Sequence, residues 1–192
     1  MSPQPYIVGI AGGSASGKTT ISNKLAAQLA PLRSVHVFHM DTYFKKDKPT
    51  MLAPITGEQF SDHNHPESFE LDQLVADLDA LCAQGEHQVI IVEGLMTLHH
   101  APLRERLDLR IFLDAPSDER IVRRMKRSLE RGGTYDEIAR FFLDSVRFRH
   151  QEFVEPSRWH ADLVLNGSYP SEKGLRVVAE WILSHSDGTP AP

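Results

Sequence analysis

The sequence lacks the features of secreted, membrane-spanning and nucleic-acid-coating proteins. Cys82 is the only cysteine in 192 residues, which excludes an internal disulfide and suits a reducing cytoplasm. The longest aliphatic run, Val89–Val92, is far shorter than the roughly 20 apolar residues that cross a membrane. Residues 1–5 hold neither the basic residue nor the apolar segment of a secretory signal, and the net charge of −5 argues against a nucleic-acid partner. We therefore expect a soluble cytoplasmic enzyme without membrane or nucleic-acid partners.

The composition and the apolar segments of the sequence predict a single α/β domain over residues 1–192. Hydrophobic residues make up 41% of the chain and charged residues 24%, as in ordinary globular proteins. A chain of this size buries roughly 70% of its unfolded surface, so it needs no disulfides for stability. Short apolar segments predict five strands, at 6–11, 35–40, 88–93, 109–113 and 161–165. Because helical patterns separate these strands, right-handed crossovers give a parallel sheet covered by helices on both faces.

The helical segments and their ends can also be predicted. Periodicity indicates a helix over 18–30 and a second from Leu71 to a stop at Gly85. A third begins after an N-cap at Ser117, and a fourth runs from Tyr135 to about Phe153, with a stop at Glu155-Pro156. The last helix carries an apolar stripe of Leu175, Val178, Ala179 and Ile182. Residues 45–67 are rich in Lys, Pro, Asp and His and are expected to be irregular. Residues 186–192 are expected to be frayed.

Residues 12–19 match the phosphate-binding pattern G-x-x-x-x-G-K-[ST]. Backbone N–H groups wrap a phosphate chain at such a loop, Lys18 reaches the β- and γ-phosphates, and the Thr19 hydroxyl ligates Mg²⁺. A flexible surface loop could match by chance, but here a buried strand precedes the pattern and an amphipathic helix follows it. The sequence therefore predicts a P-loop NTPase-type three-layer α/β/α fold with a five-stranded parallel sheet. It also predicts nucleotide contacts from Gly12, Gly13, Ser14, Ala15, Ser16, Gly17, Lys18, Thr19 and Thr20.

Two carboxylates stand at the ends of predicted strands. Asp41 follows the strand at 35–40, and Glu93 ends the strand at 88–93. Ligands bind beyond the carboxyl ends of strands in sheets of this type, so both side chains should face the phosphates. A kinase needs one carboxylate to accept the hydroxyl proton and another to hold Mg²⁺. Asp41 could instead be an N-cap or turn residue, and Glu93 a turn acceptor before Gly94, but the neighbouring phosphate loop favours the functional roles.

The segment 120–131 is strongly basic within an acidic protein. Arg120, Arg124, Arg127 and Arg131 form one stripe, opposite an apolar stripe of Ile121, Val122, Met125 and Leu129. For most of these arginines we prefer a solvated helix face. The alternative is a lid over about 120–135 whose arginines neutralise the transferring phosphoryl group, with Gly132-Gly133 as its hinge. The histidines show no zinc-ligand spacing, and Phe141-Phe142 is interpreted as core rather than as a base-stacking platform.

Several blocks resemble the uridine kinase branch of the phosphoribulokinase/uridine kinase family, from about Tyr6 to Gly167. They are GIAGGSASGKTT (9–20), DTYFKKD (41–47), NHPESFELDQL (64–74), IIVEGLMTL (90–98), DLRIFLDAPSDERIVRRMKRSLERG (108–132) and FVEPSRWHADLVLNG (153–167). The resemblance implies Asp41 as catalytic base, Lys18 as phosphate clamp, Thr19 with Glu93 at Mg²⁺, and Arg123 and Arg131 as lid arginines. It further implies that the loop after Asn166-Gly167 helps to hold adenine. Expected acceptor contacts are Asp41, Phe44, Asn64 and Arg123.

The chain departs from this family pattern where a pyrimidine base would be held. Asn64 stands where the family has a ribose-binding aspartate, and His63 where it has an aromatic residue. Only six residues separate Cys82 from Val89, where pyrimidine kinases insert a base-contacting hairpin. Gly133 and Phe141 replace an expected arginine and glutamine. We therefore expect uridine and cytidine to be poor substrates, unless Tyr43, Phe44, His63 and His65 supply another base pocket.

The sequence thus predicts an ATP- and Mg²⁺-dependent kinase, a phosphotransferase that phosphorylates a nucleoside or ribosyl 5′-hydroxyl. The acceptor could instead be a non-pyrimidine compound such as nicotinamide riboside, a vitamin or a sugar. A regulatory GTPase is disfavoured because N-K-x-D and D-x-x-G are absent, and a non-catalytic nucleotide-binding regulator is disfavoured by Asp41, Glu93 and the basic segment. Assembly into a homo-oligomer is left open by the sequence.

Overall fold

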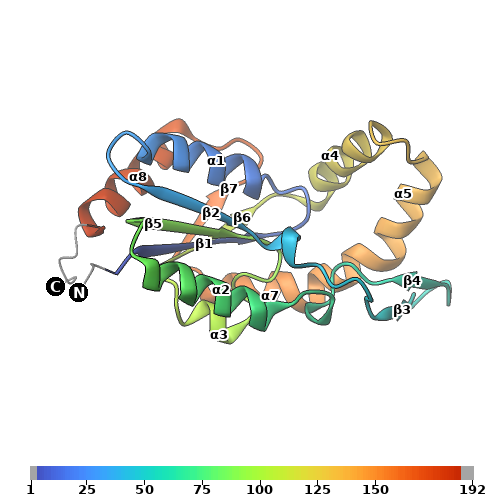
Figure 1. Ribbon diagram of the computed structural model, residues 1–192. Coiled ribbons are helices and arrows are strands. Elements are labelled where there is room, and N and C mark those ends of the chain that lie inside the picture. The colour runs from blue at the N-terminus through green and yellow to red at the C-terminus, as the bar shows by residue number, and fades with distance from the viewer. Residues whose placement is uncertain (1–3, 187–192) are drawn as a thin grey trace.

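The computed structural model describes residues 4–186, and its centre is a five-stranded parallel sheet (Figure 1). The strand order is β2–β5–β1–β6–β7. The strands are β1 (Tyr6–Gly12), β2 (Val35–His39), β5 (Val89–Glu93), β6 (Leu109–Asp114) and β7 (Leu163–Asn166). The predicted α/β fold and its five strands are confirmed. The strand ends differ from the predicted ones by up to two residues; Met40, for example, begins a 3₁₀ turn, η1 (Met40–Tyr43), instead of ending β2.

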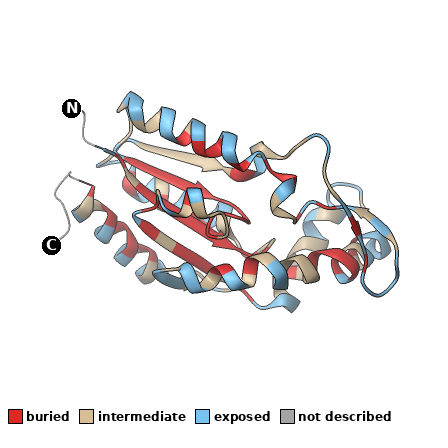
Figure 2. Cartoon of the chain, turned by 90° about the horizontal axis from the view of Figure 1, so that it is seen from below, coloured by how far each residue is buried: buried red, intermediate tan, exposed pale blue. Residues whose placement is uncertain are grey.

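Helices cover both faces of this sheet and bury two separate apolar layers. On one side lie α1 (Lys18–Leu29) and α8 (Glu172–His185); on the other lie α2 (Leu71–Gln84) and α3 (Ala101–Arg104) (Figure 1). Side chains of β1 alternate between the layers, since Val8 and Ile10 pack with α1 and α8 whereas Ile7 and Ala11 pack with α2. The central strands β5, β1 and β6 are therefore largely buried, the edge strands β2 and β7 are half-buried or exposed, and the helices are buried along one side (Figure 2). The predicted stripe of α8 is its buried face.

The segment 45–67 is not wholly irregular, which corrects the prediction. It contains an antiparallel hairpin of β3 (Thr50–Leu52) and β4 (Gln59–Ser61), followed by a 3₁₀ turn, η2 (Pro66–Ser68). Each strand has three residues, and of the six only Met51 is buried. So short a strand pair leaves no apolar alternation in the sequence from which it could be recognised.

The helical run that begins at Tyr135 is longer than predicted and is interrupted by two π-helical turns. It comprises α5 (Tyr135–Phe141), a π-helical turn η3 (Phe142–Val146), α6 (Arg147–Arg149), a second π-helical turn η4 (His150–Val154), α7 (Glu155–Ser157) and a 3₁₀ turn η5 (Arg158–His160). The expected stop at Glu155-Pro156 is wrong, because Pro156 lies in the first turn of α7. Proline lacks an N–H group and is tolerated where the hydrogen-bonding pattern of a helix changes.

Two further predicted ends need correction. The helix α4 (Ser117–Leu129) has Pro116 as its N-cap, so Ser117 is its first residue and caps nothing. Ser186, expected to be frayed, is buried, and its hydroxyl accepts a hydrogen bond from Arg33 Nε at 2.9 Å. The rest of the predicted frayed tail, 187–192, lies outside the described residues. No helix among residues 4–186 is long and apolar enough to cross a membrane.

Candidate active site

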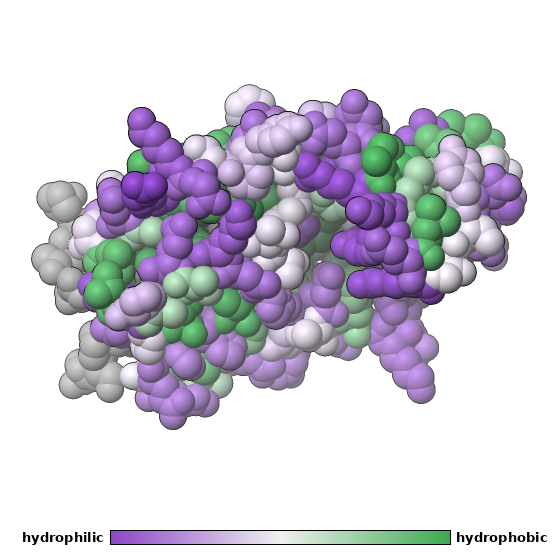
Figure 3. Space-filling model, turned by 90° about the horizontal axis from the view of Figure 1, so that it is seen from above, coloured by the Kyte–Doolittle hydropathy of each residue, from purple (hydrophilic) through white to green (hydrophobic). Residues whose placement is uncertain are grey.

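A cavity of about 860 Å³ lies beyond the carboxyl ends of β1, β2 and β5. Its walls come from the phosphate loop, the residues after β2 and β5, the helix α4, and the segment around β4 and α5. In a space-filling view, hydrophilic side chains surround the hollow between the sheet-bearing body and the α4–α5 end (Figure 3). This is the edge of the sheet where a doubly wound fold binds its ligands.

The phosphate loop joins β1 to α1 as the sequence predicts. Gly17 precedes α1 with a φ of 99°, a left-handed conformation that favours glycine. A Cβ on Gly13 would lie 2.5 Å from Arg120 Nη1, so a larger residue there would force the buried Arg120 side chain to move. Of the predicted nucleotide-binding residues, the cavity is lined by Ser14, Ala15, Gly17, Lys18, Thr19 and Thr20. Gly12, Gly13 and Ser16 are buried behind the loop surface.

Lys18 turns back over this loop, where its Nζ donates to Gly13 O at 3.0 Å. Burial lowers the pKa of Lys18, whereas the nearby carboxylates of Glu93 and Asp41 raise it. An ammonium group beside two carboxylates at a ring of backbone N–H groups is suited to a polyanion.

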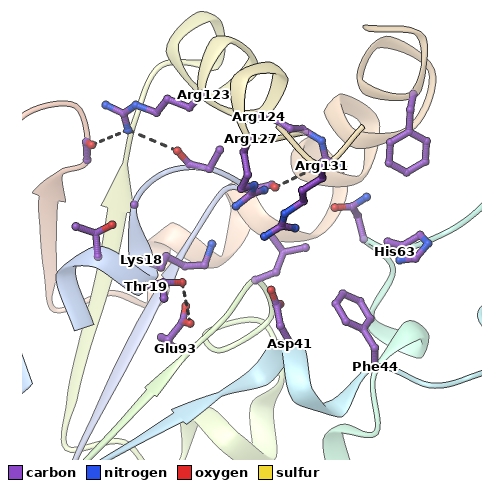
Figure 4. Close-up of a pocket in the computed structure, with 18 of the residues that line it drawn as sticks. Lys18, Thr19, Asp41, Phe44, His63, Glu93, Arg123, Arg124, Arg127 and Arg131 are labelled. Carbon is purple, nitrogen blue, oxygen red and sulfur yellow. Dashed lines mark hydrogen bonds between the residues drawn. The ribbon is translucent and has the colours of Figure 1, made fainter. Parts of the chain in front are cut away.

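Thr19 and Glu93 meet directly at the floor of the cavity (Figure 4). The Thr19 hydroxyl donates to Glu93 Oε1 at 3.0 Å, and His39 Nδ1 lies 2.8 Å from the same oxygen. Glu93 is only 5% exposed, and its Oε2 has no hydrogen-bond partner among residues 4–186. The Glu93 carboxylate thus contacts Thr19 and His39 and does not act as a turn acceptor before Gly94.

Asp41 stands opposite the phosphate loop, in the 3₁₀ turn η1 (Figure 4). Its side chain lines the cavity, and the turn is capped by neither Asp41 nor any other side chain. The carboxylate has no hydrogen-bond or ion-pair partner in the part of the chain that the structure describes. It can therefore form hydrogen bonds with a ligand that binds between Asp41 and Lys18.

Arginines of α4 and Arg131, just after it, face the cavity. The preferred interpretation of a solvated face is wrong for the half-buried Arg123 and Arg124, whereas Arg127 and Arg131 line the cavity and are also exposed. Arg123, Arg124, Arg127 and Arg131 all line the cavity. The apolar Val122 is instead 65% exposed on the outer side of α4. Of the predicted stripe, Arg124, Arg127 and Arg131 line the cavity and Arg120 is buried, whereas Arg123, outside the stripe, also lines it. Periodicity could not tell which face of the helix turns inward.

These arginines differ in how firmly they are held. Arg123 donates to Gly167 O at 2.9 Å and to Ser168 O at 3.1 Å. Arg124 donates to Ser14 Oγ at 2.8 Å, and burial beside Arg127 lowers its pKa to about 10. Among residues 4–186, Arg127 and Arg131 have no hydrogen-bond or ion-pair partner, and both reach toward Lys18 and Asp41 (Figure 4).

Aromatic side chains form the far end of the cavity, away from the phosphate loop. The Phe44 and Phe69 rings stack at 4.3 Å, and the His63 ring is edge-on to Phe44 at 5.8 Å and to Phe141 at 6.4 Å. Phe141 was expected in the core but lines the cavity, whereas Phe142 is buried as predicted. This end of the cavity offers ring faces and edges to a ligand.

Only part of the suggested base pocket is assembled at this end. Phe44 and His63 line the cavity, but Tyr43 and His65 do not. The Tyr43 hydroxyl donates to Asp77 at 2.8 Å, and His65 Nδ1 accepts from Glu67 N at 3.1 Å. Burial, with Lys48 and Arg124, lowers the pKa of His63.

Asn64 lies beside these rings on a loop fixed by an ion pair between the buried Asp62 and the half-buried Arg149. Its side chain lines the cavity, and its Nδ2 is buried without a hydrogen-bond partner. The Asn64 backbone N–H donates to Asp62 Oδ1 at 2.9 Å, and Arg149 Nε donates to Asp62 Oδ2 at 2.6 Å. Asp62, Arg149 and His39 were not singled out from the sequence, since their contacts join segments far apart in the chain.

Comparison with known proteins identifies the family of the chain. The model of the Phosphoribulokinase / Uridine kinase family matches residues 7–88 and 82–171. The chain belongs to this family. It is 32% identical to the uridine kinase of Chloroflexus aurantiacus, over 99% of this chain and all of that protein. It is 30% identical to the uridine kinase of Lactococcus lactis, over 93% and 96% of the two chains. The resemblance stated from the sequence is thereby confirmed.

Solved structures support the fold of this family member. A crystal structure from Silicibacter sp. TM1040, described as a candidate fructose transport system kinase, superposes with a TM-score of 0.65 at 23% identity, over 84% of this chain and 90% of that one. A shikimate kinase from Acinetobacter baumannii superposes with a TM-score of 0.51 at 17% identity, over 94% and 92%. Membership of the phosphoribulokinase/uridine kinase family makes the chain a phosphotransferase that acts on a hydroxyl group through a nucleotide-binding P-loop fold.

Proposed function

We propose that this chain is an ATP- and Mg²⁺-dependent kinase that transfers the γ-phosphoryl group to a hydroxyl of a ribosyl-type small molecule. The observation that carries the proposal is the placement of Asp41 in the same cavity as Lys18 and Thr19. A nucleotide held by the phosphate loop and an acceptor held beside Asp41 would meet there. Effective transfer requires this alignment of nucleophile and phosphorus.

The donors available for Mg²⁺ fit that ion. Mg²⁺ prefers oxygen ligands and keeps several waters and phosphate oxygens, so one or two protein oxygens suffice. Thr19 Oγ1 donates its hydrogen to Glu93 Oε1, so the lone pairs of Thr19 Oγ1 and the Glu93 Oε2 atom are available to a cation. Residues 4–186 hold no group of three or more His, Cys, Asp or Glu side chains that could form a separate metal centre. When bound, Mg²⁺ would neutralise charge on the β- and γ-phosphates.

The remaining charged residues have complementary roles in this proposal. Lys18, at the start of α1, holds the β- and γ-phosphates with the help of the loop N–H groups. Arg127 and Arg131, which have no partners among residues 4–186, neutralise the charge that spreads over the transferring group. Asp41 accepts the proton of the acceptor hydroxyl as the new P–O bond forms. The loop of Gly167 and Ser168 lies at the other end, where adenine would be held.

The acceptor end favours a compound with a planar ring. Phe44, His63 and Phe141 offer stacking and edge contacts, and Asn64 offers hydrogen bonds to a hydroxyl. The polar side chains near the rings include Ser61, Asn64 and Arg124. The hairpin that contacts the base in pyrimidine kinases is absent between α2 and β5, so the edge of a pyrimidine lacks those contacts. The uridine kinase names of the relatives favour a nucleoside, whereas this lining favours a ring other than uracil or cytosine, as in nicotinamide riboside. A vitamin or sugar remains the alternative acceptor.

A phosphoryl-transfer screen tests the proposed function. The protein is incubated with Mg²⁺ and γ-labelled ATP and with nucleosides, vitamins and sugars in turn, with Lys18→Ala as the control. We expect label in at least one ribosyl compound with the wild type and none with the variant. Absence of transfer to every acceptor, in a protein that binds ATP, would instead indicate a nucleotide-binding regulator.

A further inference from the structure

His39 and Glu93 are brought together by the register of the central sheet. Both residues end their strands, and β2 pairs with β5 so that His39 lies opposite Glu93. Side chains opposite each other on neighbouring strands project from the same face. The distance of 2.8 Å between His39 Nδ1 and Glu93 Oε1 therefore follows from the strand pairing.

The hydrogen-bond chemistry fixes the role of each atom in this contact. An ionised carboxylate only accepts hydrogen bonds, so Nδ1 of His39 carries the hydrogen and donates it. Thr19 Oγ1 donates to the same carboxylate oxygen at 3.0 Å. Two donors on Oε1 hold the carboxylate plane and leave Oε2 toward the cavity. Without His39, a single bond to the rotatable Thr19 hydroxyl would remain.

We propose that His39 is a positioning residue for the divalent cation: it orients Glu93 so that Glu93 Oε2 and Thr19 Oγ1 face the cation together. This inference rests on the proposed function. The His39 side chain is 38% exposed and does not line the cavity, so it acts through Glu93 and not on the phosphates. Groups that orient metal ligands in this way change metal affinity by about 10–100-fold when they are removed.

The test measures binding of the cation itself. Free Mn²⁺ is followed by its electron paramagnetic resonance signal while it is titrated into the protein with a non-hydrolysable ATP analogue. His39→Leu removes the donor at similar volume, and we expect the Kd for Mn²⁺ to rise about 10-fold. Affinity for the analogue without metal should not change, because His39 does not touch the nucleotide site.

Three further variants separate orientation of Glu93 from support of the strand. His39→Asn places an N–H donor near the position of Nδ1 and should restore most of the Mn²⁺ affinity, whereas His39→Gln, whose donor lies farther out, should not. His36→Leu is the matched control on β2. Its ring packs on Phe38 and His87 on the opposite face, so this change should leave the Kd unaltered. If His39→Leu does not fold, the difference in Mn²⁺ affinity between His39→Asn and His39→Gln tests the inference.

The outcomes distinguish this inference from the proposed function. Unchanged Mn²⁺ affinity in His39→Leu and His39→Gln would overturn the inference while leaving the kinase proposal intact. Equal weakening by the Asn and Gln variants would also overturn it, because the loss would then not depend on a donor at the Nδ1 position. If the wild type bound Mn²⁺ no better with the analogue than without it, both proposals would fail.

Discussion

Arg149 donates a hydrogen bond from Nε to the buried carboxylate of Asp62, at 2.6 Å. Arg149 ends α6, and Asp62 precedes the loop that carries Asn64 into the cavity. The contact therefore ties the helical run after residue 135 to the acceptor end of the site. A buried charge is stable only while it is paired and hydrogen-bonded.

Arg149→Met should lower the free energy of unfolding by about 3–5 kcal/mol, because it leaves the Asp62 carboxylate buried without its cation. Urea unfolding at constant pH measures the loss. The double variant Asp62→Asn/Arg149→Met removes both charges and should lose less than the single variant. An equal or greater loss in the double variant would mean that packing, and not the charge pair, stabilises this contact.

Lys18→Ala should reduce turnover by at least about 10²-fold, since it removes a charge aimed at the β- and γ-phosphates. The fold should remain intact, because Lys18 makes one hydrogen bond, to the loop carbonyl of Gly13. Steady-state kinetics and circular dichroism of the same preparation check both statements. Unchanged activity in a correctly folded variant would remove the phosphate-loop assignment.

Arg127→Ala and Arg131→Ala should each lower kcat by about 10²-fold, because their guanidinium groups are unpaired within residues 4–186 and stabilise developing charge. Arg123→Ala should mainly raise the KM for ATP, because Arg123 holds the Gly167–Ser168 loop. Lys126→Ala, an exposed change on the same helix, is the control. A kcat loss confined to Arg123→Ala would reverse these roles.

The strands, the phosphate loop and the buried faces of α1, α2 and α8 were predictable because their signals are local. Five apolar runs, a glycine-rich turn between a strand and a helix, and the spacing of Leu175, Val178, Ala179 and Ile182 each depend on neighbours in the chain. Physical rules of alternation and periodicity act over these short distances.

The rest of the site depends on contacts between distant segments. The inward turn of the α4 arginines, the β3–β4 hairpin, the Asp62–Arg149 pair and the approach of His39 to Glu93 are set by tertiary packing and strand register. Phe141 and Phe142 are the clearest example: they are adjacent in sequence, yet Phe141 lines the cavity and Phe142 is buried. The pattern of apolar residues in the sequence does not predict which of two neighbouring side chains lines a cavity.

Uridine and cytidine should be poor substrates. The cavity offers the rings of Phe44, His63 and Phe141 but lacks, between α2 and β5, the hairpin that contacts the base in pyrimidine kinases, and sites built to make such bonds discriminate by up to about 10⁴–10⁵. Asn64, as a neutral partner, should hold a ribose hydroxyl less strongly than a carboxylate would. Saturation kinetics test this: a kcat/KM for uridine of roughly 10⁴ M⁻¹s⁻¹ or more would restore a plain uridine kinase.

The most direct measurement of the central claim is single-turnover transfer from γ-labelled ATP to the best acceptor, compared between the wild type and Asp41→Asn. The asparagine keeps the size and hydrogen bonding of Asp41, which lines the cavity without a partner in residues 4–186, but it cannot take a proton. We predict that the rate of transfer falls by about 10²–10⁴-fold while ATP affinity changes little. A full rate in the variant, or a loss of ATP binding as large as the loss of transfer, would contradict the assignment of Asp41 as the base in a kinase site.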